Sequence, residues 1–170
     1  MKKWIMTCLL AFPFMVLANP SPFGLTLNQA TVAELKQKYS AKMLGYNKYS
    51  GGEVYQLTPD ELGIDGLQKA TAIFDEKGVL QGILTELPKH RFDQMYQLLS
   101  AKYKVVSSQI PFVGSKTVTM RDGETEITLN APHLSFEMEM SYLTQSLLNS
   151  FKATTSQEEQ AKKQKEMNNL

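Results

Sequence analysis

Side chains that perform catalysis or bind metal ions are scarce in this sequence of 170 residues. It holds two histidines, His90 and His133, far apart along the chain, and one cysteine, Cys8. A zinc site normally takes three or four ligands from histidine, cysteine and carboxylate side chains. The G-x-S-x-G motif that presents a nucleophilic serine in many hydrolases is absent from the sequence. We therefore favour a protein without a catalytic centre, without a metal site and without a cofactor.

Each of the two histidines has a simpler interpretation than catalysis. To act as a general base, His133 would need an orienting carboxylate, and Glu137 lies two pleats away on a predicted strand. His90 lies between Lys89 and Arg91 at the start of a predicted helix, where a basic cluster opposes the helix dipole. These three basic groups could bind an anion, but we favour an exposed surface without a ligand.

Carboxylates offer the one route to catalysis that the sequence leaves open. A glycosidase needs two carboxyl groups that converge on the substrate, and no spacing in the sequence singles out such a pair. Glu126, Glu137 and Glu139 are predicted to lie on the exposed face of a sheet, where they could form an acidic patch. Charges on an exposed strand also discourage pairing with other chains, and we favour this second explanation. The patch keeps a cell-wall-directed hydrolase or an enzyme inhibitor as the alternative function.

Two loops have the composition of a binding surface. The segment 109–114 joins two predicted strands and holds four apolar residues where turns usually hold polar ones. It either tucks back over the core or presents its phenylalanine to a partner. The loop 45–52 holds two tyrosines among glycine, asparagine and serine, a composition that binding loops favour. The predicted contact residues are Tyr46, Tyr49, Pro111, Phe112 and Val113.

The amino terminus has the three parts of a secretory signal peptide. Residues 1–3 are basic, residues 4–17 form an uncharged and mostly apolar run, and Ala18 supplies a small residue at its end. This run is shorter than the roughly 20 residues of a membrane span, and Pro13 interrupts it. Cys8 lies too early in the run to be a site of lipid attachment. We predict cleavage after Ala18 and a mature protein that is periplasmic or secreted.

Composition narrows the classes of protein to which the mature chain can belong. Removal of Lys2 and Lys3 leaves 16 of the 18 basic residues against 17 acidic ones, a net charge of −1 with neutral histidines. A chain so balanced lacks the basic footprint of a nucleic-acid-binding protein. After residue 18 no run is long and apolar enough for a membrane span, and no cysteine remains for a disulfide. About 150 residues suffice for one apolar core, so we predict a single domain.

Apolar residues at helical spacing predict the helices. Thr31 and Glu34 match a capping box before a short helix over 31–39. A second helix begins near Lys89, and its apolar stripe consists of Phe92, Met95, Tyr96, Leu99 and Tyr103. A further short helix is predicted around Leu147, Leu148 and Phe151. The charged polar tail that follows is expected to be solvated and either helical or disordered.

Alternating side chains and turn residues predict the strands. A strand over 53–57 is followed by a hairpin of strands 69–74 and 79–84, which is apolar on both faces and therefore predicted to be central and covered on both sides. Asp122-Gly123 predicts a tight turn that pairs Val118 with Ile127. Alternation along the last strands predicts these inward-facing residues: Val118, Met120, Ile127, Leu129, Leu134, Phe136, Met138, Met140 and Tyr142.

This order of elements predicts an α+β fold in which antiparallel sheet meanders carry helices packed on one face. The sequence of helix, strands, helix, strands suggests two halves, each made of one helix and one meander. We predict a signal peptide over 1–18, a single α+β domain over 19–153 and the charged polar tail over 154–170.

A weak motif near the mature amino terminus resembles a family of small exported domains. Residues 23–27, Phe-Gly-Leu-Thr-Leu, and 31–35, Thr-Val-Ala-Glu-Leu, are similar to the entry of β-lactamase-inhibitor-protein-like domains. Small outer-membrane-assembly lipoproteins share a similar order of elements. The resemblance covers these two segments and the element order, and it implies a non-enzymatic binding module. No functional residue is transferred, because this chain lacks the lipobox and disulfide cysteines of those proteins.

Together these observations favour an exported domain, typical of a Gram-negative periplasm, that works by binding a protein or an envelope component. We expect no nucleic-acid partner.

Overall fold

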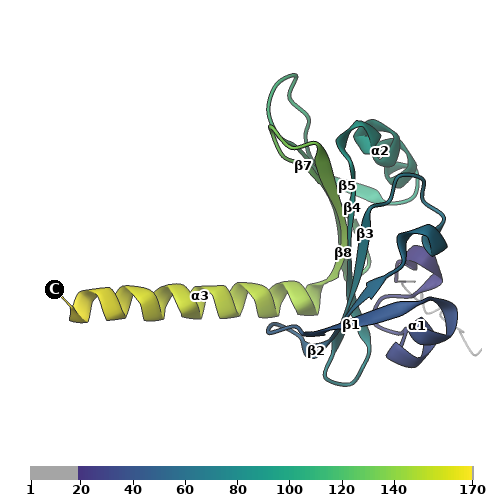
Figure 1. The fold of residues 1–170 in the computed structure, drawn as a ribbon. Helices are drawn as coiled ribbons and strands as arrows, with labels where there is room; N and C mark the ends of the chain where they lie inside the picture. Colours follow the sequence, from purple (N-terminus) through teal and green to yellow (C-terminus); the bar gives the residue numbers. More distant parts are fainter. Residues whose placement is uncertain (1–18, 170) are drawn as a thin grey trace, which may run out of the picture.

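A single antiparallel sheet of eight strands, in the order β1-β2-β3-β4-β8-β7-β6-β5, organises the protein (Figure 1). The computed structural model describes residues 19–169; the predicted signal peptide, residues 1–18, lies outside this range. The strands are β1 (Ala41–Tyr46), β2 (Gly51–Leu57), β3 (Lys69–Asp75), β4 (Leu80–Pro88), β5 (Lys104–Gln109), β6 (Lys116–Asp122), β7 (Thr125–Ala131) and β8 (Glu137–Thr144). The helices are α1 (Val32–Lys38), α2 (Phe92–Ser100) and α3 (Gln145–Asn168), with 3-10 turns at Pro22–Gly24, Pro59–Leu62 and Lys89–Arg91.

The chain consists of two similar halves that meet between β4 and β8. In the first half α1 precedes the meander β1–β4, and in the second α2 precedes the meander β5–β8. Each meander has its last strand at the centre of the sheet, where β4 pairs with β8 from Gly82–Leu143 to Pro88–Glu137. The predicted α+β fold, with antiparallel meanders and helices on one face, is therefore confirmed.

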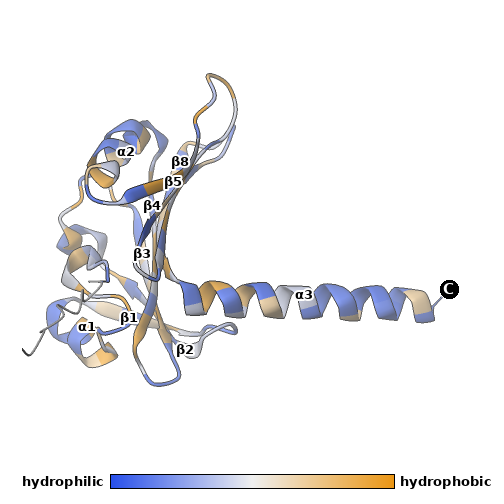
Figure 2. Ribbon diagram, turned by 180° about the vertical axis from the view of Figure 1, so that it is seen from behind, coloured by the Kyte–Doolittle hydropathy of each residue, from blue (hydrophilic) through white to orange (hydrophobic). Residues whose placement is uncertain are grey.

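The core lies between one face of the sheet and the helices α1 and α2 (Figures 1 and 2). Side chains alternate along each strand, so every second residue of β3, β4, β6, β7 and β8 enters this layer. The largest fully buried side chains are Tyr55, Phe74, Phe92, Leu25, Leu27, Leu35, Leu57, Leu80, Ile83, Leu87, Met120 and Ile127. On the opposite side, which we call the open face, the first turns of α3 are the only helix that residues 19–169 supply.

The open face corrects one prediction about the central hairpin. β3 and β4 are central as expected, but only their inner residues, such as Phe74 and Ile83, lie under the helix layer. On the other side Ile73 is covered by the base of α3, whereas Leu84 is exposed. The hairpin is thus covered on both faces only where α3 begins, because no other element reaches this side of the sheet.

The β6–β7 hairpin has the predicted faces but a different register. The predicted pairing of Val118 with Ile127 is wrong: Val118 pairs with Leu129 and Met120 pairs with Ile127. The turn residues are Gly123 and Glu124, one position later than expected. A pairing shift of two residues leaves every side chain on its original face, so the buried set of this hairpin is confirmed.

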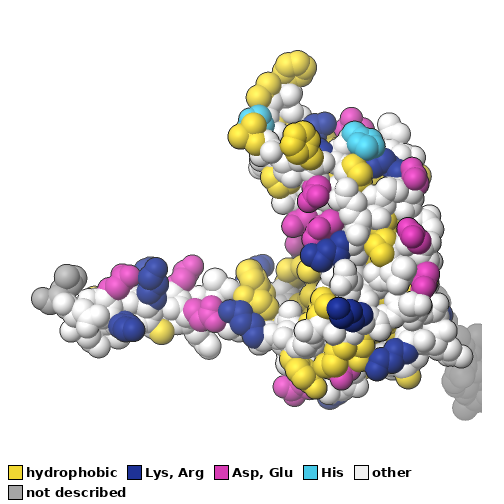
Figure 3. Space-filling view, viewed as in Figure 1, with side chains coloured by type: hydrophobic (Ala, Val, Ile, Leu, Met, Phe, Trp, Pro, Cys, Tyr) yellow, Lys and Arg dark blue, Asp and Glu magenta, His cyan; other side chains and the backbone are white. Residues whose placement is uncertain are grey.

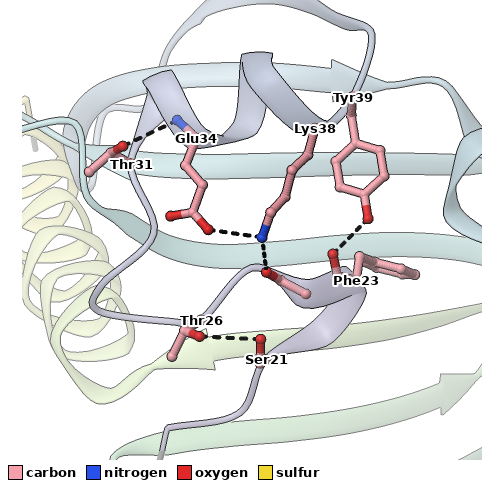
Figure 4. A network of polar contacts seen from close by, with 8 residues as sticks. Ser21, Phe23, Thr26, Thr31, Glu34, Lys38 and Tyr39 are labelled. Atoms are coloured by element: carbon pink, nitrogen blue, oxygen red, sulfur yellow. Dashed lines mark hydrogen bonds and ion pairs between the residues drawn. The ribbon is translucent and has the colours of Figure 1, made fainter.

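The amino-terminal segment is fastened to α1 by polar contacts (Figure 4). The Lys38 ammonium donates to the Gly24 carbonyl oxygen at 2.6 Å and to Glu34 at 2.9 Å. The Tyr39 hydroxyl donates to the carbonyl oxygen of Phe23 at 2.7 Å. The predicted cap of α1 is present, since the Thr31 hydroxyl accepts from the Glu34 amide at 3.3 Å. These bonds hold the chain from residue 21 onward over the core.

Helix α3 leaves the open face as one continuous rod (Figure 1). Its 24 residues span about 36 Å at 1.5 Å per residue, so the predicted tail is helical through Asn168. Thr144 caps its first turn and also donates to Gln81 of β4 at 2.8 Å. Beyond Phe151 most of its side chains are exposed. Among residues 19–169, no helix combines the length and apolarity needed to cross a bilayer.

Candidate binding surface

Two loops at one end of the sheet expose a group of large apolar side chains. The β5–β6 loop and the β7–β8 loop lie at the same end because β5 and β7 both run toward it. We call this group the apolar rim; it consists of Ile110, Phe112, Val113, Leu134 and Phe136. Phe112 is 104% exposed, Phe136 93%, Leu134 88% and Val113 71%. Apolar side chains gather at this end of the space-filling view (Figure 3).

Hydrogen bonds join the two loops of the rim and hold the second in place. The His133 amide donates to the Ser115 hydroxyl of the β5–β6 loop at 2.9 Å. From the turn Lys89–Arg91, the Lys89 amide donates to the Phe136 carbonyl oxygen at 2.8 Å, and the Lys89 ammonium donates to the Pro132 carbonyl oxygen. Leu134 and Phe136 therefore stand on a backbone that hydrogen bonds hold in place.

The backbone at Leu134 adopts a conformation that its residue type disfavours. The Ser135 amide donates to the Pro132 carbonyl oxygen at 3.3 Å, which closes a turn over residues 132–135. Leu134 is the third residue of this turn and has φ 66°. Glycine or asparagine is usual at such a position, because a Cβ atom crowds the backbone at positive φ. The turn thus holds an exposed leucine where a small or polar residue would fit better.

The rim departs from the predicted alternation of the last strand. Leu134 and Phe136 were predicted to face the core with Met138, and this is wrong for both. β8 begins only at Glu137, since the chain must reverse between Ala131 of β7 and the neighbouring strand. The sequence did hold a signal for this turn. If β7 pairs with the next strand in an antiparallel manner, the segment between them, residues 132–136, must form the turn.

The two rim loops contain basic residues but no acidic ones. Neither 109–116 nor 132–136 contains an acidic residue, and together they contain Lys116 and His133. The adjoining turn adds Lys89, His90 and Arg91, of which Arg91 is paired with Asp65. Lys116 lies 3.3 Å from Asp93, and Glu137 follows the rim directly on β8.

The other predicted contact residues lie at the opposite end of the sheet. The β1–β2 loop carries Tyr49, whose ring packs edge-on against Phe151 of α3 with centroids 4.9 Å apart. Lys48 of this loop pairs with Glu158 at 2.9 Å. Tyr46 is 72% exposed and stands apart from this contact. The structure therefore brings Phe112 and Val113 together with Leu134 and Phe136, but does not bring them near Tyr46 or Tyr49.

A groove runs along the open face beside α3. Its apolar half has a volume of about 290 Å³ and is lined by Asn47, Tyr49, Ile73, Leu84, Leu143, Leu147, Leu148 and Phe151. Its polar half, of about 270 Å³, shares Leu84 and Leu143 and adds the charged side chains Lys69, Glu86 and Glu139. Gly82 lies beneath α3, where a Cβ atom would be 2.7 Å from the Leu143 side chain and 3.1 Å from that of Leu147.

The carboxylates on the open face form a dispersed row. Glu139 pairs with Glu86 across β8 and β4, and Lys69 binds Glu86 at 2.8 Å. This hydrogen bond, with the nearby charges of Glu137 and Glu139, raises the pKa of Lys69. Glu126 lies four residues along β7 from the partner of Glu139, about 13 Å at the rise of a strand. Of the three carboxylates singled out in the sequence, Glu126 thus stands apart, whereas Glu137 and Glu139 lie two residues apart on the same face of β8.

Glu86 was missed because the predicted strand ended at Leu84. β4 continues to Pro88, which places Glu86 on the open face two residues beyond Leu84.

Both histidines lie at the rim end of the molecule. His90 is exposed in the turn Lys89–Arg91, and His133 is exposed in the β7–β8 loop rather than on a strand. Within the described range of 19–169, no three histidine, aspartate or glutamate side chains lie close enough together to hold a metal ion.

Comparison of the chain with family models, with curated proteins and with solved structures finds no match.

Proposed function

We propose that this protein is an exported, non-catalytic binding domain, and that the apolar rim is its contact surface. The observation that supports the proposal is the rim itself. Four of its side chains are more than two-thirds exposed, and they lie on two loops joined by a hydrogen bond. Contiguous exposed apolar groups are uncommon on proteins that bind nothing and mark sites of contact with a protein or a membrane.

Export fits this role. The basic, apolar and small-residue pattern of residues 1–18 favours a domain that works in the periplasm or after secretion. The partner is then another exported protein or a component of the envelope. A hydrolase or an enzyme inhibitor acting through the open-face carboxylates has less support, because Glu126 is remote from Glu137 and Glu139, and Lys69 pairs with Glu86 beside them.

Site-specific photo-crosslinking in cells tests the proposal. A photoreactive phenylalanine at Phe112 is expected to form a discrete adduct with a protein or a lipid. The matched position is Tyr46, which is 72% exposed but lies at the other end of the sheet. An adduct from position 112 that is absent at position 46 supports the rim as the contact surface. Identical adducts from both positions, or none from position 112, would contradict it.

A further inference from the structure

We propose that the apolar rim inserts into the interface of an anionic phospholipid bilayer, so that the domain docks peripherally on a membrane of the envelope. This assignment rests on the proposed function and names the partner of the same site. It commits to a lipid surface in place of a protein, for reasons of shape, backbone conformation and charge.

Shape is the first reason. Phe112 is 104% exposed, so its ring makes almost no contact with its own chain. Protein–protein hot spots lie instead near the centre of well-packed patches that neighbouring residues surround and shield from water. The β5–β6 loop extends past the end of the sheet (Figure 1). Rings and aliphatic groups that project from two loops suit a fluid phase, which closes around all of them at the boundary of headgroups and acyl chains.

The second reason is the backbone at Leu134. The third position of the turn 132–135 has φ 66°, where asparagine or glycine would avoid the steric cost of a leucine Cβ. The leucine gains little from the fold in return, because it is 88% exposed. Residues that break a local rule without a structural gain are characteristic of functional sites. In the bilayer interface this leucine would bury its side chain next to Phe136.

The third reason is charge. The two rim loops contain no acidic residue, and Lys89, His90, Lys116 and His133 lie in them or adjoin them. Basic groups beside an inserting apolar surface are attracted to anionic headgroups within about a Debye length of the membrane. Outside the loops, Asp93 is paired with Lys116 and Glu137 begins β8. The apolar tip itself therefore carries no negative charge, and two lysine ammonium groups, those of Lys89 and Lys116, lie at its base.

Vesicle flotation tests the assignment. The chain is used from Asn19, where the predicted mature protein begins, because the apolar run before it would itself bind lipid. We expect it to float with vesicles of phosphatidylethanolamine and phosphatidylglycerol, and to bind phosphatidylcholine vesicles more weakly. Phe112→Ser and Phe136→Ser should each lower the partition coefficient by about tenfold, from the loss of one buried ring. Tyr46→Ser, at the opposite end of the sheet, should leave it unchanged.

Both rings lie outside the core, so their replacement removes no core contact, and a circular dichroism spectrum of each variant checks that the fold is intact. Leu134→Asn provides a second, independent variant that should also weaken flotation. Failure of the parent chain to float, or rim variants that float as well as Tyr46→Ser, would overturn the bilayer assignment. Equal binding to both vesicle types would overturn the part assigned to anionic lipid.

The outcomes separate this assignment from the proposed function. If the chain does not float with vesicles but position 112 crosslinks to a protein in cells, the bilayer assignment is disproved and the proposed binding function is retained. If the chain neither floats with vesicles nor crosslinks at position 112, both proposals are overturned.

Discussion

Replacement of Leu134 by asparagine should stabilise the protein while it weakens membrane docking. At φ 66° a branched or bulky residue costs about 1–2 kcal/mol relative to residues that tolerate this region, and asparagine is one of these. Leu134 is 88% exposed, so little of its transfer free energy contributes to folding. Full burial of a leucine is worth about 1.5–3 kcal/mol, and the small buried fraction therefore contributes only about 0.2–0.4 kcal/mol. The free energy of unfolding should rise by about 1 kcal/mol.

Urea unfolding followed by far-ultraviolet circular dichroism measures this change. Tryptophan fluorescence is not a suitable probe, because the only tryptophan is Trp4. In a domain of this size, 1 kcal/mol corresponds to an increase in Tm of about 2–4 °C. The slope of the unfolding free energy against urea should stay the same, since the surface exposed on unfolding hardly changes.

Two matched variants separate the effect of backbone strain on stability from the effect of the side chain. Leu134→Ala removes the apolar group but keeps a Cβ at positive φ, so its stability should match that of the parent. Phe136 is equally exposed and is not among the residues with positive φ. Phe136→Asn should thus stay within about 0.5 kcal/mol of the parent. If Leu134→Asn is no more stable than these two variants, the strain argument is refuted, and with it one of the three reasons for the bilayer.

Two further predictions concern α3 and the core. Tyr49→Ala removes the ring that packs on Phe151, a contact worth about 1–1.5 kcal/mol. Amide hydrogen exchange in the first turns of α3 should then accelerate by about tenfold. The control variant Tyr46→Ala should leave this exchange rate unchanged. An unchanged rate in Tyr49→Ala would show that other contacts anchor α3. Burial raises the pKa of Tyr142 above its ordinary value of 10.0. The unfolded chain therefore loses this proton before the folded one, and the free energy of unfolding should fall as the pH rises above about 10. Tyr142→Phe should show a smaller fall in urea unfolding across that range, and equal slopes for parent and variant would disprove the assignment.

Local patterns were sufficient to predict the elements with strong periodicity. The stripe of α2 predicted the buried residues Phe92, Met95 and Leu99 because helical spacing alone assigns a face. In the same way, alternation along β6 and β7 predicted the buried face even though the register was off by two residues. The edge strand β1 was missed: its side chains are largely exposed, so it has no apolar pattern to reveal it. Its place in the sheet comes from pairing with β2.

For the proposed contact surface, the sequence predicted only one of the two loops. Phe112 was identified because apolar residues are unusual in a connecting segment, but either a tucked or an exposed loop was consistent with that composition. Leu134 and Phe136 continue the alternation of β8, so alternation by itself predicts that they are buried. Tyr49, the other aromatic residue predicted to be a contact, packs on Phe151 of α3.

By itself the sequence determined the α+β class, the positions of α1 and α2, the inward faces of the central strands and the scarcity of catalytic groups. These properties depend on residue type and on spacing within one element, which a chain carries whatever its neighbours are. Tertiary structure alone decided the pairing of β4 with β8, the reversal of the chain at residues 132–136 and the meeting of two distant loops at one end of the sheet. Each of these depends on which segments become neighbours, and no local pattern of side chains encodes that.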